Sequence, residues 1–164
     1  MTREVLIALL IGLLPTMGVP KGVHLPASDP FMVRSNGCAD DVLEVTRELV
    51  PEAQVSTWAP IVFVFAQKES ACRTNPAGFN DDGNACGVLQ VHTPEKIVPG
   101  ATCAKVRADR KLGLRVGLTL MLAKAKECGS IRGGLTAFAM RGECPKGWTL
   151  PLVVQRCKLA GGVC

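Results

Sequence analysis

The chain has 164 residues, which is the size of one domain with a single hydrophobic core. Aromatic residues make up only 4% of it and no base-stacking motif is present, so the composition argues against a nucleic-acid-binding protein. The net charge of +5 is uneven, because residues 1–82 hold 6 basic and 10 acidic side chains whereas residues 83–164 hold 13 and 4. A basic half suits an anionic polymer as partner, although a solvated basic face is the simpler interpretation of any single lysine or arginine.

The first twenty residues have the pattern of an export signal. Arg3 precedes an apolar run from Val5 to Leu14, which is too short to span a bilayer comfortably and is followed by two prolines. We expect cleavage near residues 16–19, with an uncleaved N-terminal membrane anchor as the alternative. Residues 21–37 are punctuated by proline and glycine and are predicted to form an irregular linker.

All eight cysteines follow this signal. Their even number in a small exported chain predicts four disulfides and a periplasmic or extracellular location, but the sequence does not choose among the many pairings. The cysteines are Cys38, Cys72, Cys86, Cys103, Cys128, Cys144, Cys157 and Cys164. No Cys-x-x-Cys pair occurs and the only histidines are His24 and His92, so we predict no metal site and no cofactor.

The apolar pattern predicts a helix over residues 39–50 that Pro51 ends. A second helix should begin near residue 57, with Pro60 in its first turn. It is apolar on nearly all sides from Ile61 to Ala66, so it should be the buried centre of the fold.

The rest of the chain is predicted to be mainly helical as well. Residues 71–93 should form a loop with a short hairpin, and the helical segments that follow are expected at 94–97, 101–105, 109–126, 130–139 and 150–159. The prediction is therefore a small, mainly α (α+β) catalytic domain over residues 38–164, with a hairpin or loop over the active cleft. We expect it to be monomeric and stapled by its disulfides.

One carboxylate, Glu69, stands where the apolar helix ends, and a polar segment that could fold back over it follows. Burial beside apolar groups and the partial negative charge of a helix C-terminus both help a carboxyl group to keep its proton near neutral pH. Such a group suits general acid catalysis. The alternative interpretation of Glu69 is a solvated glutamate at a helix end.

Around this residue the sequence resembles a known catalytic signature. Glu69-Ser70, the loop Asn80-Asp81-Asp82-Gly83 and the segment Gly87-Val88-Leu89-Gln90 are together similar to the signature of the lytic transglycosylase and goose-type lysozyme families. The loop is closest to that of single-domain transglycosylases of secretion and conjugation systems. Residues 109–117 resemble the family segment that opens its long central helix, and residues 134–139 resemble the family segment ending in Ala-Tyr-Asn-x-Gly. The resemblance covers about residues 57–142.

The resemblance implies a lysozyme-like fold and cleavage of peptidoglycan glycan strands at the β-1,4 bond from MurNAc to GlcNAc. Glu69 would protonate the leaving oxygen and then take the proton of the sugar's own 6-hydroxyl, giving a 1,6-anhydro product. The expected substrate-binding residues are Gln90, Phe138, Ser70 and Gly87. Gln90 would bond the sugar or its N-acetyl group and Phe138 would line the cleft. Ser70 would brace the loop and Gly87 would allow close backbone approach.

The sequence departs from the family pattern at Phe138, at Ala139 and at Gly113, which replaces the usual asparagine. The family tyrosine is Phe138 here and the following asparagine is Ala139, so no tyrosine hydroxyl is available to bond the catalytic carboxylate. Core packing is the alternative interpretation of Phe138, and bracing of a loop is the alternative for Gln90. His92 is interpreted as a loop residue rather than a catalytic base.

Two other functions remain open from the sequence. A lysozyme-type hydrolase would need a second carboxylate, for which Asp81 and Asp82 are the candidates, although both also suit a simple turn. A wall-binding or structural protein with a degenerate site is the other alternative. The expected context is an exported protein that is free, membrane-anchored or virion-associated, working in wall remodelling, in a secretion or conjugation apparatus, or in a phage particle.

Overall fold

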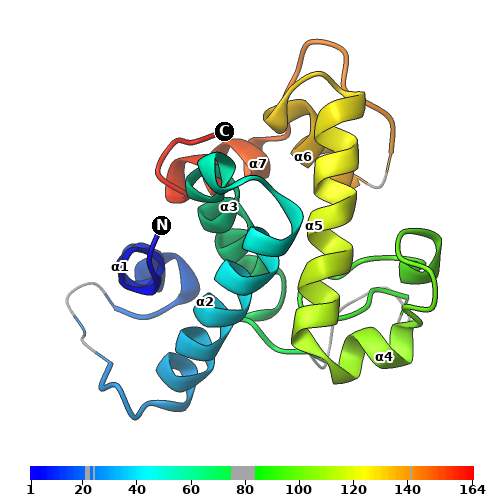
Figure 1. Ribbon diagram of the computed structural model, residues 1–164. Helices are drawn as coiled ribbons and strands as arrows, with labels where there is room; N and C mark the ends of the chain where they lie inside the picture. The colour runs from blue at the N-terminus through cyan, green and yellow to red at the C-terminus, as the bar shows by residue number, and fades with distance from the viewer. Residues whose placement is uncertain (21–22, 24, 75–83, 141) are drawn as a thin grey trace.

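The computed structural model describes residues 1–20, 23, 25–74, 84–140 and 142–164, and within them the chain is mainly helical (Figure 1). In chain order the elements are α1 (Arg3–Leu13), the 3-10 turn η1 (Leu14–Met17), α2 (Pro30–Leu49), α3 (Glu52–Ser70), η2 (Pro94–Lys96), α4 (Cys103–Ala108), α5 (Arg110–Glu127), α6 (Ile131–Met140) and α7 (Pro151–Leu159). The helices predicted after residue 93 are confirmed to within two or three residues at most boundaries.

The predicted hairpin is visible only in part. Of the segment 71–93, the described residues contain one isolated antiparallel bridge, in which Cys86 and Val91 exchange backbone hydrogen bonds of 2.9 and 3.0 Å. Asp81 and Asp82 lie outside the described residues.

Helix α3 is the centre of the fold, as its apolar run predicts. It lies among the other helices (Figure 1) and contacts α1, α2, α5 and α7. Its residues from Trp58 to Gln67 are all buried. Pro60, however, lies inside the helix rather than in its first turn, because α3 begins at Glu52, directly after Pro51. The helix ends at Ser70. The next residue, Ala71, has a left-handed backbone conformation and caps the helix, because its N–H donates to carbonyl groups of the last turn.

Helix α2 corrects the second part of the irregular linker predicted over residues 21–37, because residues 30–37 are helical. It begins at Pro30, because the side chain of Asp29 accepts a hydrogen bond from the N–H of Phe31 at 2.8 Å and Pro30 suits a first helical turn. Gly37 does not break it. A Cβ there would lie 3.0 Å from the guanidinium of Arg110, so the missing side chain lets α5 approach α2.

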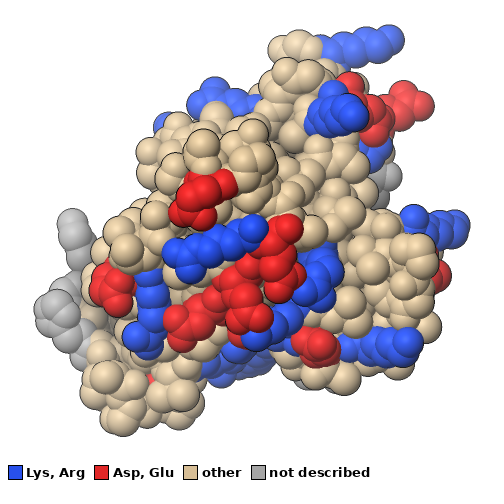
Figure 2. Space-filling model, viewed as in Figure 1, with Lys and Arg blue, Asp and Glu red and all other residues tan. Residues whose placement is uncertain are grey.

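Ion pairs join α2 to α5 and neutralise part of the basic second half. Arg110 donates to Asp41 at 2.6 Å, Lys111 donates to Glu44 at 2.7 Å, and Arg115 pairs with Glu48. The face in Figure 2 accordingly shows acidic and basic side chains interleaved rather than a uniform basic surface.

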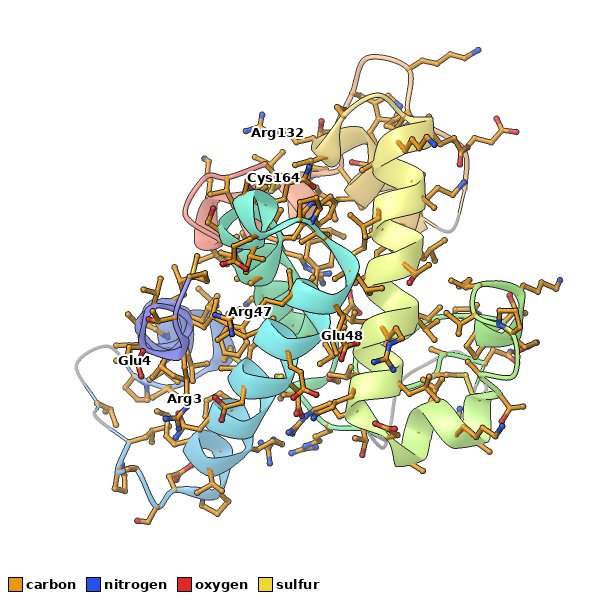
Figure 3. The ribbon with its side chains drawn as sticks, viewed as in Figure 1. Arg3, Glu4, Arg47, Glu48, Arg132 and Cys164 are labelled. Atoms are coloured by element: carbon orange, nitrogen blue, oxygen red, sulfur yellow. A yellow bond between two sulfur atoms is a disulfide. The ribbon has the colours of Figure 1, made fainter. Side chains whose placement is uncertain are left out.

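Helix α1, the predicted export signal, packs on the helical body in this structure. Its inner residues Leu6, Leu10 and Leu13 are buried in the common core, and the helix contacts α2, α3 and α7. At its start Arg3 pairs with Asp40 of α2 at 3.3 Å (Figure 3). Of the helices in the described part of the chain, none combines the length and hydropathy needed to cross a membrane.

Four disulfides are present, as the cysteine count predicts. They join cysteines that are neighbours in the sequence order: Cys38–Cys72, Cys86–Cys103, Cys128–Cys144 and Cys157–Cys164. This pairing is compatible with an oxidising, exported location.

Candidate active site

A cavity of about 530 Å³ opens where α3, α5, α6 and the segment after residue 88 meet. Its volume is in the range of small-molecule binding sites. It is lined by Glu69, Leu89, Gln90, Val91, His92, Thr93, Ile97, Leu120, Lys124, Ala137, Phe138, Ala139, Gly142 and Glu143. Three of the predicted site residues, Glu69, Gln90 and Phe138, therefore share one cavity, whereas Ser70 and Gly87 do not line it.

Glu69 occupies the last turn of α3 and is held by a partner that the sequence did not suggest. The guanidinium of Arg156, on α7, donates a hydrogen bond to Oε1 of Glu69 and forms an ion pair with it. The Glu69 side chain is 25% exposed and that of Arg156 is 13% exposed, so the pair is only partly screened by water. Burial is thus only one part of the environment of Glu69, and a fixed positive charge is the other.

Two phenylalanine rings, Phe65 and Phe138, pack next to this ion pair. The guanidinium carbon of Arg156 lies 4.5 Å from the ring centroid of Phe65, within the range of a cation–π contact. The Phe65 ring in turn meets the ring of Phe138 edge to face, with centroids 6.0 Å apart. Phe138 therefore does both things that the sequence left as alternatives, since it lines the cavity and packs against the core.

Ser70 is buried and braces the site rather than facing the cavity. Its hydroxyl lies 2.8 Å from the carbonyl oxygen of Val88 and 3.0 Å from that of Ala66. The contact with Val88 joins the end of α3 to the segment that carries Gln90.

Gln90 and Gly87 shape the turn that follows. The backbone of Gln90 is left-handed, with φ of 51°, and its side-chain amide donates to the carbonyl of Gly87 at 2.7 Å. Gln90 therefore braces the turn and also lines the cavity. Gly87 has φ of +67°, and a Cβ there would lie 2.5 Å from a methyl of Val106, so the close approach it permits is to α4.

The cavity also contains charged residues that sequence reasoning missed. Glu143 is a second carboxylate in the lining of the cavity, and Lys124 of α5 adds a cation that is paired with Glu127 at 2.8 Å. Glu143 lies just beyond residue 142, where the family resemblance stops. Arg156 lies 87 residues from Glu69, and no local pattern links the two.

Lys68, beside Glu69 on α3, is oriented away towards the N-terminal segment. Its ammonium donates to the hydroxyl of Thr16 at 2.7 Å and to the carbonyl of Thr16 at 3.2 Å. Burial lowers the pKa of Lys68 below its ordinary value of 10.5, and the nearby charge of Arg156 lowers it further.

Two disulfides hold Cys72, just after α3, and Cys86, just before the turn that carries Gln90. Cys72 is tied to Cys38 of α2, and Cys86 is tied to Cys103, the first residue of α4. Each of these two cysteines is therefore tied to the helical body and not to the other. In the described residues no three His, Cys, Asp or Glu side chains are grouped as metal ligands would be.

Comparison of the chain with protein-family models, with curated proteins and with solved structures found no match. The geometry of the site therefore carries the functional argument.

Proposed function

We propose that the chain is an exported lytic transglycosylase that cleaves peptidoglycan, with Glu69 as its acid and base. One observation carries the proposal: Glu69, Gln90 and Phe138, which come from three separate parts of the chain, line a single cavity. These are the residues for which the resemblance implies catalysis and substrate binding.

The proposed reaction needs one carboxyl group. Glu69 donates its proton to the glycosidic oxygen as positive charge develops on the sugar, and the resulting carboxylate then takes the proton of the 6-hydroxyl as that oxygen attacks the anomeric carbon. The guanidinium of Arg156 supplies a positive charge beside the carboxylate formed after the first transfer. Gln90 and Phe138 contact the sugar rings.

The test is to incubate the oxidised full chain with purified peptidoglycan and to identify the soluble products by mass spectrometry. Fragments one water lighter than hydrolysis products are expected, and they should disappear in Glu69→Gln. Glu52→Gln is the matched control, because Glu52 stands at the opposite end of the same helix and is exposed. A Glu69→Gln protein that still releases fragments would contradict the proposal.

A lysozyme-type hydrolase is a second candidate, and a specific observation favours it. Glu143 lines the same cavity as Glu69, so a second carboxylate is available there independently of Asp81 and Asp82. This reaction gives full-mass products with reducing ends. It also requires that Glu143→Gln, or a change of Asp81 or Asp82, abolishes cleavage.

A non-catalytic wall-binding protein is the third candidate. The ion pair of Glu69 with Arg156 is its support, because a paired carboxylate can simply hold α7 against α3. It predicts that folded, oxidised protein sediments with peptidoglycan and releases no soluble fragment. In all three cases we propose a monomer that works outside the cytoplasm, free or anchored, in wall remodelling, in a secretion or conjugation apparatus or in a phage particle.

A further inference from the structure

Three interactions hold Arg156 in place, two at its guanidinium and one through the backbone of α7. Its guanidinium bonds Oε1 of Glu69 and lies over the ring of Phe65, which is itself almost fully buried. The next residue, Cys157, is buried and bonded to Cys164, so the backbone of α7 is fixed at this point. A planar cation that is stacked and hydrogen-bonded has little freedom to rotate.

The two carboxylate oxygens of Glu69 are therefore not equivalent. Glu69 lines the cavity, whereas Arg156, which bonds its Oε1, is not among the lining residues. Arg156 occupies Oε1, and within the described part of the chain no second residue bonds the carboxylate. Oε2 is left as the oxygen that can exchange a proton with a ligand.

We propose that Arg156 is a positioning residue that fixes the orientation of Glu69, so that Oε2 is presented to the substrate. The proposal rests on the proposed catalytic role of Glu69. Neutral or mobile side chains at position 156 leave the carboxylate free to rotate about the last torsion of its side chain. A small misplacement of a catalytic group is enough to cost about 100-fold in rate.

The experiment compares Arg156→Met, Arg156→Lys and Arg156→Ala with the wild-type full chain, using release of soluble peptidoglycan fragments. We expect Arg156→Met to lower kcat by about 100-fold with KM little changed. Arg156→Lys keeps the charge and should retain more activity than Arg156→Met. Added guanidinium ion, at concentrations too low to unfold the protein, should restore part of the activity of Arg156→Ala.

The matched control is Arg132→Met. Arg132 of α6 donates to the main-chain oxygen of Cys164 at 2.6 Å and so also holds the C-terminal segment (Figure 3). The hydrogen bond and ion pair of Glu69 are made by Arg156 and not by Arg132. This variant should keep wild-type kcat and should not respond to guanidinium. Thermal unfolding of every variant, followed by circular dichroism, separates loss of fold from loss of position.

The outcomes distinguish this inference from the function on which it rests. If Glu69→Gln is inactive while folded Arg156→Met is as active as wild type, the positioning role is wrong and the catalytic proposal stands. The positioning role is also wrong if the Arg156 variants lose activity only in proportion to their loss of thermal stability, and if neither lysine at position 156 nor added guanidinium restores activity. If wild-type protein releases no fragments, the proposed function fails and the positioning role fails with it.

Discussion

The hydroxyl of Ser70 donates to the carbonyl oxygen of Val88 at 2.8 Å, and this bond connects the end of α3 to the turn that carries Gln90. Glu69 is the neighbour of Ser70 and Gln90 follows Val88 by two residues. This buried side-chain contact therefore helps to fix the relative position of the two cavity residues. The disulfides that end this segment, at Cys72 and Cys86, lie further from the cavity residues in the sequence.

Ser70→Ala should lower the free energy of unfolding by about 1–3 kcal/mol, because the carbonyl of Val88 would be left buried without this donor. The proposed cleavage activity should fall as well, because Gln90 loses this connection to α3. Denaturant unfolding and the peptidoglycan assay measure the two effects. Ser56→Ala is the control, because Ser56 is exposed on the same helix and should change stability by less than about 0.5 kcal/mol. Equal stability of the two variants would contradict the bracing role.

The elements that sequence predicted well carry local signals. Helix α5 was expected over residues 109–126, and Asp109 caps it by accepting from the N–H of Leu112 at 3.1 Å. The central place of α3 followed from its apolar run. In both cases the residues that determine the helix lie close together in the sequence, in a capping turn or in a short apolar run.

The features that sequence missed depend on contacts between distant parts of the chain. Sequence analysis missed the start of α2 because glycine usually disfavours a helix interior. At Gly37, however, the missing side chain leaves room for the guanidinium of Arg110. Arg156 reaches Glu69 only because α7 docks on α3, and Glu143 reaches the cavity because α6 places the residues after it there.

The disulfides should differ in their contribution to stability because they close loops of different length. Cys38–Cys72 spans 34 residues and Cys157–Cys164 spans 7. Loop entropy gives contributions of about 3.8 and about 2.4 kcal/mol respectively. Replacing both cysteines of each pair by alanine and measuring urea unfolding should show the larger loss for the longer loop. A larger loss for the Cys157–Cys164 pair would show that contacts made by α7, rather than loop entropy, dominate.

Lys68 should make stability rise with pH in the alkaline range. Its pKa is lowered in the folded protein, first by burial and then by the charge of Arg156, so the folded state loses this proton at a lower pH than the unfolded state. Between the lowered pKa and 10.5 the unfolded chain binds more protons, and the free energy of unfolding therefore increases with pH. The neutral amine still has N–H groups to donate to Thr16.

The check is the difference in unfolding free energy between wild type and Lys68→Met, measured from neutral pH up to 10.5. This difference should move in favour of the wild type as pH rises. The raised pKa of Lys111, which comes from its hydrogen bond with Glu44, acts in the opposite sense but is common to both proteins and cancels. A difference that is constant with pH would show that Lys68 titrates alike in the folded and unfolded states.

The packing of α1 on the helical body predicts that the buried face of this helix contributes to the stability of the full chain. Leu10 is fully buried between α1 and the helical body, whereas its neighbour Ile11 is 53% exposed. Leu10→Ala should therefore destabilise the full chain by about 2–5 kcal/mol, through lost apolar burial and the cavity left behind. Ile11→Ala should change stability by less than about 0.5 kcal/mol. Thermal and denaturant unfolding of the two variants, which differ only in which face of one helix is trimmed, give the comparison. Equal stabilities of the two variants would mean that α1 is not packed on the helical body in solution. In that case the protein without residues 1–20 should unfold at the same temperature as the full chain.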